Sequence, residues 1–368
     1  MKNKLWMLLA VLALFAAACG SDSEGAEGGD TDESTESDDG GSDEGDSDEG
    51  GSDGVMADVE ELNVAYFAEW PTPNQIGQED GSFGEAVGAE INWMPFANGG
   101  EMTEAMESGN VDIAYSQGLT PFANTVNAGS DLRLVGIAVS YAEADNCIAQ
   151  GSLGVTKENA AETLAGATVA TPIGNVTHYK FIKMMEHLDV DIADLDVIQA
   201  GTGADTAAAF ENGEIDVGCA FGGAIEQMIA ADGEVIMTGA EQEDEIGLST
   251  YDIVSIPTSF GEDHPDTVTA FLRATNEFNA KWAEDPEGTN DTIATAAGME
   301  DVGNFLAGEG WFEFPTVEEQ LSDDWLGDGG VAEAMQGQVQ TFVDSGDLTG
   351  SALDDFSTFI DTSYLEAI

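Results

Sequence analysis

The sequence predicts an α/β protein whose two lobes turn their loops toward one cleft. Short β-rich runs alternate with helical patterns from Leu62 onward, as in folds with mostly parallel sheets. One pattern of helix, glycine, turn and strand occurs twice, about a hundred residues apart. About 310 residues follow an N-terminal polar segment, which is more than one hydrophobic core usually organises.

The first 19 residues predict export. Lys2 and Lys4 precede an apolar run, Leu5–Ala18, that is too short to span a bilayer and ends in small residues before Cys19. We expect a lipoprotein signal peptide, with Cys19 as the lipid-bearing N-terminus. Ordinary cleavage is the alternative, because Ala16 occupies the position where a leucine is usual. No later segment is apolar enough to span a membrane, so we expect the mature protein to be membrane-bound through its lipid only.

An acidic tether is predicted over residues 20–58. Residues 20–54 hold 15 acidic residues and no basic ones among serine, glycine and threonine. Such a segment cannot bury enough apolar surface to offset the entropy of ordering.

The folded body is also very acidic. The whole chain has 73 Asp and Glu against 8 Lys and Arg, and 58 of the acidic residues follow residue 54. This charge repels itself at low ionic strength, whereas the Debye length falls to about 3 Å in 1 M salt. We therefore predict a salt-adapted protein that loses stability on desalting; an ordinary acidic secreted protein is the alternative. A nucleic-acid partner is excluded because there is no basic stripe to meet phosphates. The basic residues after the tether are Arg133, Lys157, Lys180, Lys183, Arg273 and Lys281.

Cys147 and Cys219 remain after Cys19. Outside the cell they could form a disulfide, or they could be two separate buried thiols. The histidines, at positions 178, 187 and 264, show no metal-ligand spacing with them. No cofactor or metal is predicted.

The duplicated pattern sets the architecture. Met102–Tyr115 and Thr206–Cys219 each predict a helix that ends at a glycine, followed by a turn and an apolar strand. A glycine-bearing loop follows each strand, at residues 116–118 and 221–223. Loops at the carboxyl ends of parallel strands bind ligands in open α/β sheets, so two copies predict two lobes facing one cleft.

The remaining elements divide between the lobes. Asp252–Pro257 is expected to be a strand that returns the chain to the first lobe, and Pro265 begins a long helix that runs to about Trp282. Residues 285–368 are expected to be helical with short loops and contain no recognisable motif. We expect lobe 1 at 60–143 plus 250–368, and lobe 2 at 144–249. Further predicted strands are Leu62–Phe67, Ile91–Phe96, Val111–Tyr115, Leu132–Val139 and Ala167–Ala170, and further helical segments are Thr316–Leu321 and Val331–Phe342.

Catalysis is not predicted. The histidines belong to no recognisable nucleophile or metal motif, and no G-x-S-x-G elbow is present. The glycine-rich tether has no strand before it and no helix after it, so it is not a phosphate-binding loop.

The sequence supports ligand binding better than catalysis, and the first candidate site is the segment Thr171–Tyr179. A strand, a glycine-containing turn and a helix start bring free backbone N–H groups together, which is how helix N-termini hold anions. The side chains of Asn175, Thr177 and His178 could add hydrogen bonds. The alternative is plain helix capping, with the histidine at the surface.

A second loop with the same logic follows the strand that ends at Tyr115. Gln117, Gly118 and Thr120 precede a helix that begins near Pro121. Opposed helix starts could clamp an anionic group from both sides without an arginine.

Aromatic residues gather near these loops, and Trp70 is expected in a loop rather than in the core. Such rings can enclose alkyl carbons and attract an ammonium group. Glu69 and Asp252 are the carboxylates best placed to pair with it, although solvated surface carboxylates are the alternative for both. The clustered aromatic residues are Tyr66, Phe67, Trp70, Tyr115, Tyr179, Phe221 and Tyr251.

From about Glu61 to Pro286 the chain resembles the taurine-binding proteins of ABC importers. The resemblance is strongest from Thr171 to Val190. It is carried by Tyr66-Phe67, Trp70-Pro71, Gln75, Gln78, Glu90-Ile-Asn-Trp93, Gly109-Asn-Val-Asp112-Ile, Thr171-Pro172, Thr177-His178-Tyr179, His187-Leu-Asp-Val190 and Tyr251-Asp252.

The resemblance implies the periplasmic-binding-protein type II fold, in which two α/β lobes joined by two crossings close on a ligand by a hinge. It implies a monomeric binding protein, not an enzyme, that holds taurine or a close aminosulfonate and delivers this ligand to a permease with its ATPase. That family usually has Trp-Asp-Pro where this chain has Phe221-Gly222-Gly223, so Glu69 or Asp252 would have to meet the amine. The implied ligand-binding residues are Glu69, Trp70, Gln75, Gln117, Gly118, Thr120, Thr171, Asn175, Val176, Thr177, His178, Phe221, Gly222, Tyr251 and Asp252.

Two alternatives stay open beside taurine. One is a binder of an alkanesulfonate, another small organic anion or a quaternary amine on the same fold. The other is an enzyme that makes a thiamine precursor, which would need a cofactor-linked lysine; Lys180 and Lys183 are the lysines near a candidate loop.

Overall fold

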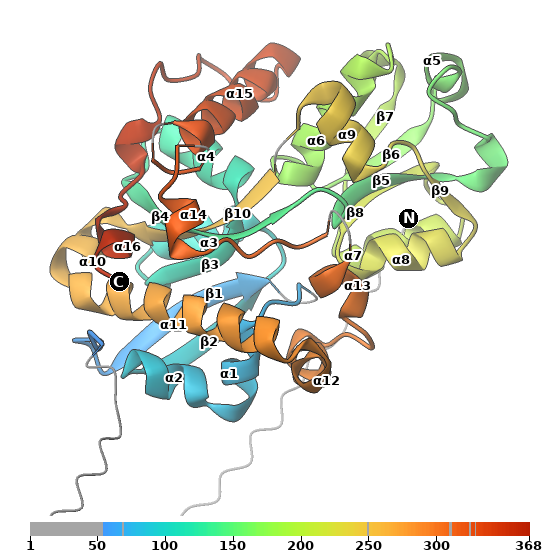
Figure 1. Cartoon of the computed structure of the whole chain (residues 1–368). Helices are drawn as coiled ribbons and strands as arrows, with labels where there is room; N and C mark the ends of the chain where they lie inside the picture. The colour runs from blue at the N-terminus through green and yellow to red at the C-terminus, as the bar shows by residue number, and fades with distance from the viewer. Residues whose placement is uncertain (1–53, 68–69, 249, 309–310, 324, 328) are drawn as a thin grey trace, which may run out of the picture. The chain divides into compact units, whose positions relative to one another are not determined.

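Two five-stranded sheets organise the chain (Figure 1). The computed structural model describes residues 54–67, 70–248, 250–308, 311–323, 325–327 and 329–368, all within one unit of the chain that spans 53–368. The predicted signal peptide, Cys19 and most of the acidic tether lie outside the described residues. The ordered body begins before the predicted end of the tether, because the Ala57 N–H donates to the Val87 carbonyl and Asp58 bonds to Thr267.

The strands come from two parts of the chain. The first sheet has the order β2-β1-β3-β10-β4 and the second the order β7-β6-β8-β5-β9. The first comprises β1 (Glu61–Phe67), β2 (Glu90–Phe96), β3 (Ile113–Gly118), β4 (Leu132–Tyr141) and β10 (Thr250–Pro257). The second comprises β5 (Asp145–Gln150), β6 (Thr168–Thr171), β7 (Asp196–Gln199), β8 (Val217–Phe221) and β9 (Gly233–Val235).

The two sheets repeat one topology. In each, the first parallel strand lies between the second and the third: β1 pairs with β2 and β3, and β6 pairs with β7 and β8. The next strand is antiparallel, and it is the strand by which the chain enters that sheet from the other: β10 in the first and β5 in the second. The duplication expected from the helix–glycine–turn–strand pattern therefore extends to whole sheets. The expected lobe limits, 143/144 and 249/250, fall between strands of different sheets.

Helices α1 to α9 lie between strands, and α10 to α16 follow the last strand, β10. They are α1 (Asn74–Asp80), α2 (Ser82–Val87), α3 (Gly99–Glu107), α4 (Leu119–Asn127), α5 (Ala160–Thr163), α6 (Val176–His187), α7 (Gly203–Glu211), α8 (Gly223–Ala230), α9 (Gly239–Ile246), α10 (Thr258–Asp263), α11 (Pro265–Glu284), α12 (Pro286–Ala297), α13 (Gly303–Ala307), α14 (Val317–Gln320), α15 (Gly330–Ser345) and α16 (Ser363–Glu366). Short 3₁₀ turns occur at Gly151–Leu153, Ile192–Asp194 and Ser357–Phe359.

Local chemistry explains several boundaries. The Thr202 hydroxyl accepts from the Asp205 N–H and the Asp205 carboxylate accepts from the Thr202 N–H, so a capping box begins α7. Gly109 and Gly213, which end the two copies of the pattern, have φ of 72° and 69°, the left-handed region that favours glycine. Pro265 begins α11 as predicted, since a proline is tolerated where no intrahelical N–H bond is needed.

The C-terminal helix α15 contacts both halves. It packs against α4 and α6, which follow β3 and β6 (Figure 1). Phe342 of α15 is buried among residues of the second sheet's core such as Phe181, although sequence places residues 250–368 in lobe 1. This helix therefore contacts both of the helices that begin beside the cavity described below.

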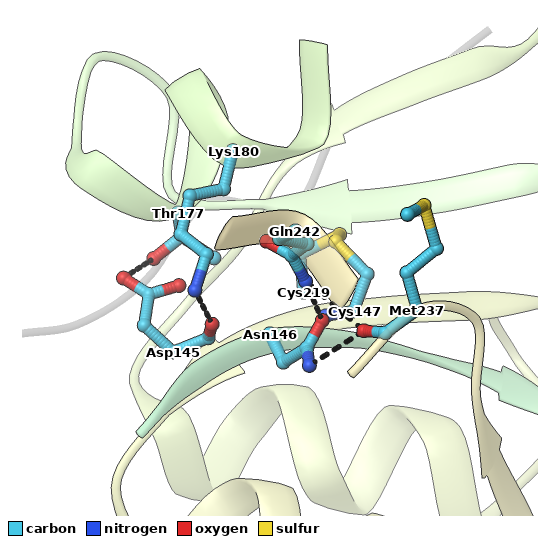
Figure 2. The surroundings of a disulfide bond; sticks show 8 residues. All are labelled: Asp145, Asn146, Cys147, Thr177, Lys180, Cys219, Met237 and Gln242. Atoms are coloured by element: carbon cyan, nitrogen blue, oxygen red, sulfur yellow. Dashed lines mark hydrogen bonds between the residues drawn. A yellow bond between two sulfur atoms is a disulfide. The ribbon is translucent and has the colours of Figure 1, made fainter. Parts of the chain in front are cut away.

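Cys147 of β5 and Cys219 of β8 face each other across an antiparallel pair and form a disulfide (Figure 2). Both cysteines are buried. Within the described part of the chain, no helix has the length and apolar character to cross a membrane.

Candidate ligand-binding site

A cavity lies between the carboxyl ends of the strands of the two sheets. It contains about 300 Å³ of space not filled by protein atoms, part of which is open to solvent. Both sheets and both crossings contribute to its wall, as expected of a ligand site in an open α/β fold. The lining residues are Phe67, Trp70, Gly118, Tyr141, Asp145, Asn175, Val176, Thr177, Phe221 and Asp252.

Two helix starts face each other in this cavity. Gly118 precedes α4, Asn175 precedes α6, and neither helix has a side-chain cap. A β-carbon added to Gly118 would lie 3.0 Å from a Val176 methyl carbon, so the two starts approach closely. The N–H groups of a helix's first turn have no intrahelical partner and are available to an anion.

Aromatic rings form the apolar wall. The Trp70 ring centroid lies 5.1 Å from that of Tyr141 and 5.9 Å from that of Phe221, and Phe67 also contacts Phe221 at 5.9 Å. Phe312, from the C-terminal region, packs against Trp70, with the two ring centroids 4.6 Å apart. Trp70 lies in a loop as expected, but it is only 3 % exposed and packs in the hydrophobic core of the first sheet, so the expectation that it lies outside the core is wrong.

Hydrogen bonds connect Trp70 to a buried carboxylate. The Trp70 Nε1–H donates to the Ser116 hydroxyl at 3.1 Å, and that hydroxyl donates to Asp252 Oδ2 at 2.9 Å. The Tyr141 hydroxyl donates to Asp252 Oδ1 at 3.0 Å. Ser116 makes these contacts with a φ of 58°, a left-handed conformation that is uncommon for serine and is often found at functional sites. Burial raises the pKa of Asp252 to about 8, against the lowering effect of the two hydroxyl donors.

Asp145 is a second buried carboxylate in the cavity. Its Oδ2 accepts from the Thr177 hydroxyl at 3.1 Å, whereas its Oδ1 is buried without a hydrogen-bond partner. Lys180 lies beside it, with Nζ donating to the backbone carbonyls of Ala142 at 2.6 Å and Asp145 at 2.5 Å (Figure 2). Burial raises the pKa of Asp145 to about 6, and the Lys180 charge and the Thr177 hydroxyl oppose that rise.

Seven residues expected from sequence line the cavity. They are Trp70, Gly118, Asn175, Val176, Thr177, Phe221 and Asp252. Glu69 lies outside the described residues.

Gln117 and Thr120, by contrast, face the interior of the first sheet's layer. The Gln117 amide donates to the Gly99 carbonyl and Thr103 hydroxyl and accepts from Ser255. The Thr120 hydroxyl donates to Gln338 of α15 at 2.7 Å.

The other expected residues also lie outside the cavity wall. His178 accepts from the Gly174 N–H at 3.3 Å and packs its ring on Phe342, so it shapes the turn before α6 rather than lining the cavity. The side-chain amide of Gln75 donates to the backbone carbonyl of Trp70 and so stabilises that loop. The remaining three are Thr171, buried in β6; Gly222, at the start of α8; and Tyr251, which contacts the Trp325 ring.

Sequence reasoning missed Tyr141 and Asp145 as site residues. Both lie at the first crossing between the sheets, as Tyr251 and Asp252 do at the second. The recurrence of a tyrosine and an aspartate where the chain passes between the sheets could have indicated these two site residues from the sequence. Phe67, which was noted among the aromatic residues, completes the wall.

A larger opening adjoins the cavity and shares Asn175 and Phe221 with it. It is lined by polar residues such as Asn98, Glu101 and Thr202, which lie at the starts of α3 and α7. Among the described residues, no group of three or more His, Cys, Asp or Glu is placed to hold a metal ion.

Comparison with known proteins identifies the fold and the family. The family model described as NMT1/THI5 like matches residues 72–289. The taurine-binding periplasmic protein of Escherichia coli (strain K12) is 24% identical over 232 residues, which cover 63% of this chain and 69% of that protein. The alkanesulfonate-binding protein SsuA from Xanthomonas axonopodis pv. citri, solved with MOPS, has a TM-score of 0.67 at 16% identity, covering 83% of this chain and 99% of that one.

A desulfurization enzyme, DSZB, also shares the fold, with a TM-score of 0.56 at 12% identity over 84% of this chain and 98% of that one. The predicted two-lobed periplasmic-binding-protein type II fold and the resemblance to taurine-binding proteins are confirmed.

Proposed function

The chain belongs to the NMT1/THI5-like family, and from this premise we propose that it is an extracytoplasmic solute-binding protein of an ABC importer that binds a small organic sulfonate. Taurine or a close aminosulfonate is the preferred ligand. The observation that carries the proposal is the pair of helix starts, at Gly118 and Asn175, that line one cavity. The binding proteins similar to it, from Escherichia coli and Xanthomonas axonopodis, are named for taurine and alkanesulfonate.

The sulfonate group would sit on backbone N–H groups rather than on basic side chains. None of the ten lining residues is lysine or arginine. The first turn of α6 offers N–H groups at Val176 and Thr177, both in the cavity wall, and the helix dipole favours negative charge there. The carbon chain of the ligand would lie against Trp70, Phe67 and Phe221.

Binding would favour closure of the lobes, because the ligand contacts elements of both sheets. Gly118 and Asp252 belong to the first sheet, whereas Phe221 belongs to β8 of the second sheet and Thr177 to α6, which follows β6 of that sheet. A ligand that touches both lobes shifts the population toward the closed state by its differential affinity.

The test is a ligand panel on the mature protein in about 1 M NaCl, which screens its acidic surface. Taurine, ethanesulfonate, nitrate and glycine betaine would be compared by calorimetry and by the shift in melting temperature, which grows with ligand concentration over Kd. We expect taurine and ethanesulfonate to bind. A flat response to both sulfonates would contradict the proposal, and a response to nitrate or glycine betaine alone would reassign the ligand.

An enzymatic role is the weaker candidate, raised by the shared fold of the desulfurization enzyme. A cofactor-linked lysine is disfavoured because Lys180 is buried and its Nζ donates to two carbonyls, while Lys183 pairs with Glu186 at 2.5 Å. Incubation with pyridoxal phosphate should give no Schiff-base absorbance.

We also propose a lipid anchor at Cys19, monomeric function and delivery to a permease with its ATPase. Relatives named as periplasmic support the extracytoplasmic location. Replacing Cys19 with alanine should release the protein from the membrane fraction; continued membrane association would contradict the anchor.

A further inference from the structure

We infer that the Asp145 carboxylate is the hydrogen-bond acceptor for a cationic N–H group of the ligand, so that the cavity selects sulfonates bearing a primary or secondary ammonium. This inference rests on the proposed function and narrows its ligand class. It places the ammonium at Asp145, where the chain first passes from the first sheet to the second, rather than at Asp252, Glu69 or the loop at 221–223.

The first observation is the unequal state of the two oxygens of Asp145. The residue is 2 % exposed and lines the cavity. Its Oδ2 accepts from Thr177, but its Oδ1 is buried without a donor (Figure 2). A buried carboxylate oxygen without a donor is costly, and a ligand N–H in the cavity would satisfy it.

The second observation is that Asp252 is already engaged. Ser116 donates to its Oδ2 and Tyr141 to its Oδ1. Each oxygen of Asp252 therefore already accepts a hydroxyl hydrogen bond, so its hydrogen-bonding positions are less open than the Oδ1 of Asp145. The two carboxylates differ in role, with Asp145 making the directional contact.

The third observation is the setting of Asp145 itself. The Lys180 ammonium bonds to the backbone carbonyls of Ala142 and Asp145, so a fixed positive charge supports an ionised Asp145 without occupying its Oδ1. Thr177, which holds Oδ2, belongs to the first turn of α6. The acceptor for the ammonium is thus held by the same helix turn that offers N–H groups to the sulfonate.

The aromatic wall suits a cation but does not distinguish its substituents. Trp70, Tyr141 and Phe221 would attract any ammonium through their ring faces. A trimethylammonium group has no N–H and would leave the Oδ1 of Asp145 unpaired. The structure therefore predicts that affinity falls as the nitrogen loses its last hydrogen, even though the apolar contact grows.

The test measures Kd for taurine, N-methyltaurine, N,N,N-trimethyltaurine and ethanesulfonate on the wild-type protein and on Asp145→Asn. The wild type should bind taurine and N-methyltaurine about 10- to 100-fold more tightly than the trimethyl compound and ethanesulfonate. In Asp145→Asn that preference should fall to less than about threefold, while the Kd for ethanesulfonate changes little.

The ratio of the two affinities separates recognition from folding, since a merely damaged site would weaken all four ligands together. Asp252→Asn is the matched variant, and it should keep a larger part of the preference for N–H ligands. Equal binding of taurine and ethanesulfonate by the wild type would overturn the inference and leave the sulfonate-binding proposal intact. No binding of any sulfonate would overturn both.

Discussion

The starts of α4 and α6 follow the same pattern of strand, glycine-containing turn and helix, yet the structure uses them differently. At α6, Val176 and Thr177 face the cavity and no side chain caps the helix. At α4, Pro121 in the first turn has no N–H, and the Thr120 hydroxyl is bonded to Gln338 of α15. Only Gly118 of that loop lines the cavity. The start of α6 therefore has backbone N–H donors at the cavity, whereas the start of α4 contributes a glycine that leaves room for a ligand.

Each start also has its own carboxylate. Asp252 lies beside Gly118, whose added β-carbon would be 3.7 Å from Oδ1, and its oxygens are satisfied by protein hydroxyls. Asp145 is held by Thr177 at the start of α6, and one of its oxygens is open. A repeated sequence pattern therefore predicts where two elements meet, but not which of them does the binding.

The largest expected effect comes from filling the space at α4. Gly118→Val is allowed by the backbone, because φ is −59° and ψ is 140°, but its methyl groups would collide with Val176. We expect sulfonate affinity to fall about 100-fold or more, since the two helix starts could no longer approach. Calorimetry measures the loss. Gly337→Ala in α15, where an added β-carbon meets nothing within 4 Å, is the control and should leave Kd unchanged.

The next effect tests the donors at α6. Val176→Pro removes one N–H at the first helical position, where proline fits, and the extended backbone of Asn175 is compatible with a following proline. Sulfonate affinity should fall about 10- to 100-fold, the loss expected for a hydrogen bond to a charged group. Val176→Ala removes the methyl groups and keeps the N–H, so its Kd should change much less. Equal losses in both variants would show that the side chain, not the amide, matters.

Sequence could predict the local part of this comparison. The turns at Gly118 and Asn175 follow from strand and helix patterns that involve neighbouring residues, and both line the cavity. The orientation of Gln117 could not be predicted, because neighbouring side chains of a strand point to opposite faces and the register of β3 was unknown. Ser116 therefore faces Trp70 and Asp252, whereas Gln117 faces Thr103 and Ser255.

The part of the site that depends on long-range packing was beyond the sequence. Asp145 meets Thr177 from 32 residues away, and Tyr141 meets Asp252 from 111 residues away. These contacts exist only when the two crossings lie side by side. Their distance along the chain explains why Asp252 was expected in the site and its partners were not.

The two carboxylates should also differ in the pH dependence of stability. Both have folded-state pKa values raised by burial, to about 8 for Asp252 and about 6 for Asp145, above an unfolded value of about 3.9. The folded state then holds a proton that the unfolded state has lost, so each contribution is full below pH 4 and is lost as the pH rises through the folded value.

Replacing each aspartate with asparagine separates the contributions of the two carboxylates to the pH dependence of stability. Between pH 6 and 8, Asp252→Asn should flatten the fall in the free energy of unfolding, by at most about 1.4 kcal/mol per pH unit for one proton. Asp145→Asn should flatten it only between pH 4 and 6. Denaturant unfolding of ligand-free protein at fixed high salt measures both slopes. The same slope change in both variants between pH 6 and 8 would contradict the distinction.

The smallest expected effect on binding is at Thr120. Its hydroxyl joins the start of α4 to Gln338, so Thr120→Val leaves a buried amide oxygen without its donor and should lower the free energy of unfolding by about 1–3 kcal/mol. Ligand affinity should change less than about threefold, because the hydroxyl faces α15 rather than the cavity. Thr177→Val at the other helix start is the matched variant and should weaken taurine binding more than ethanesulfonate binding, since it releases Asp145. If Thr120→Val instead weakened binding tenfold with little loss of stability, α4 would be a ligand-contacting helix start after all, and the contrast between the two starts would fail.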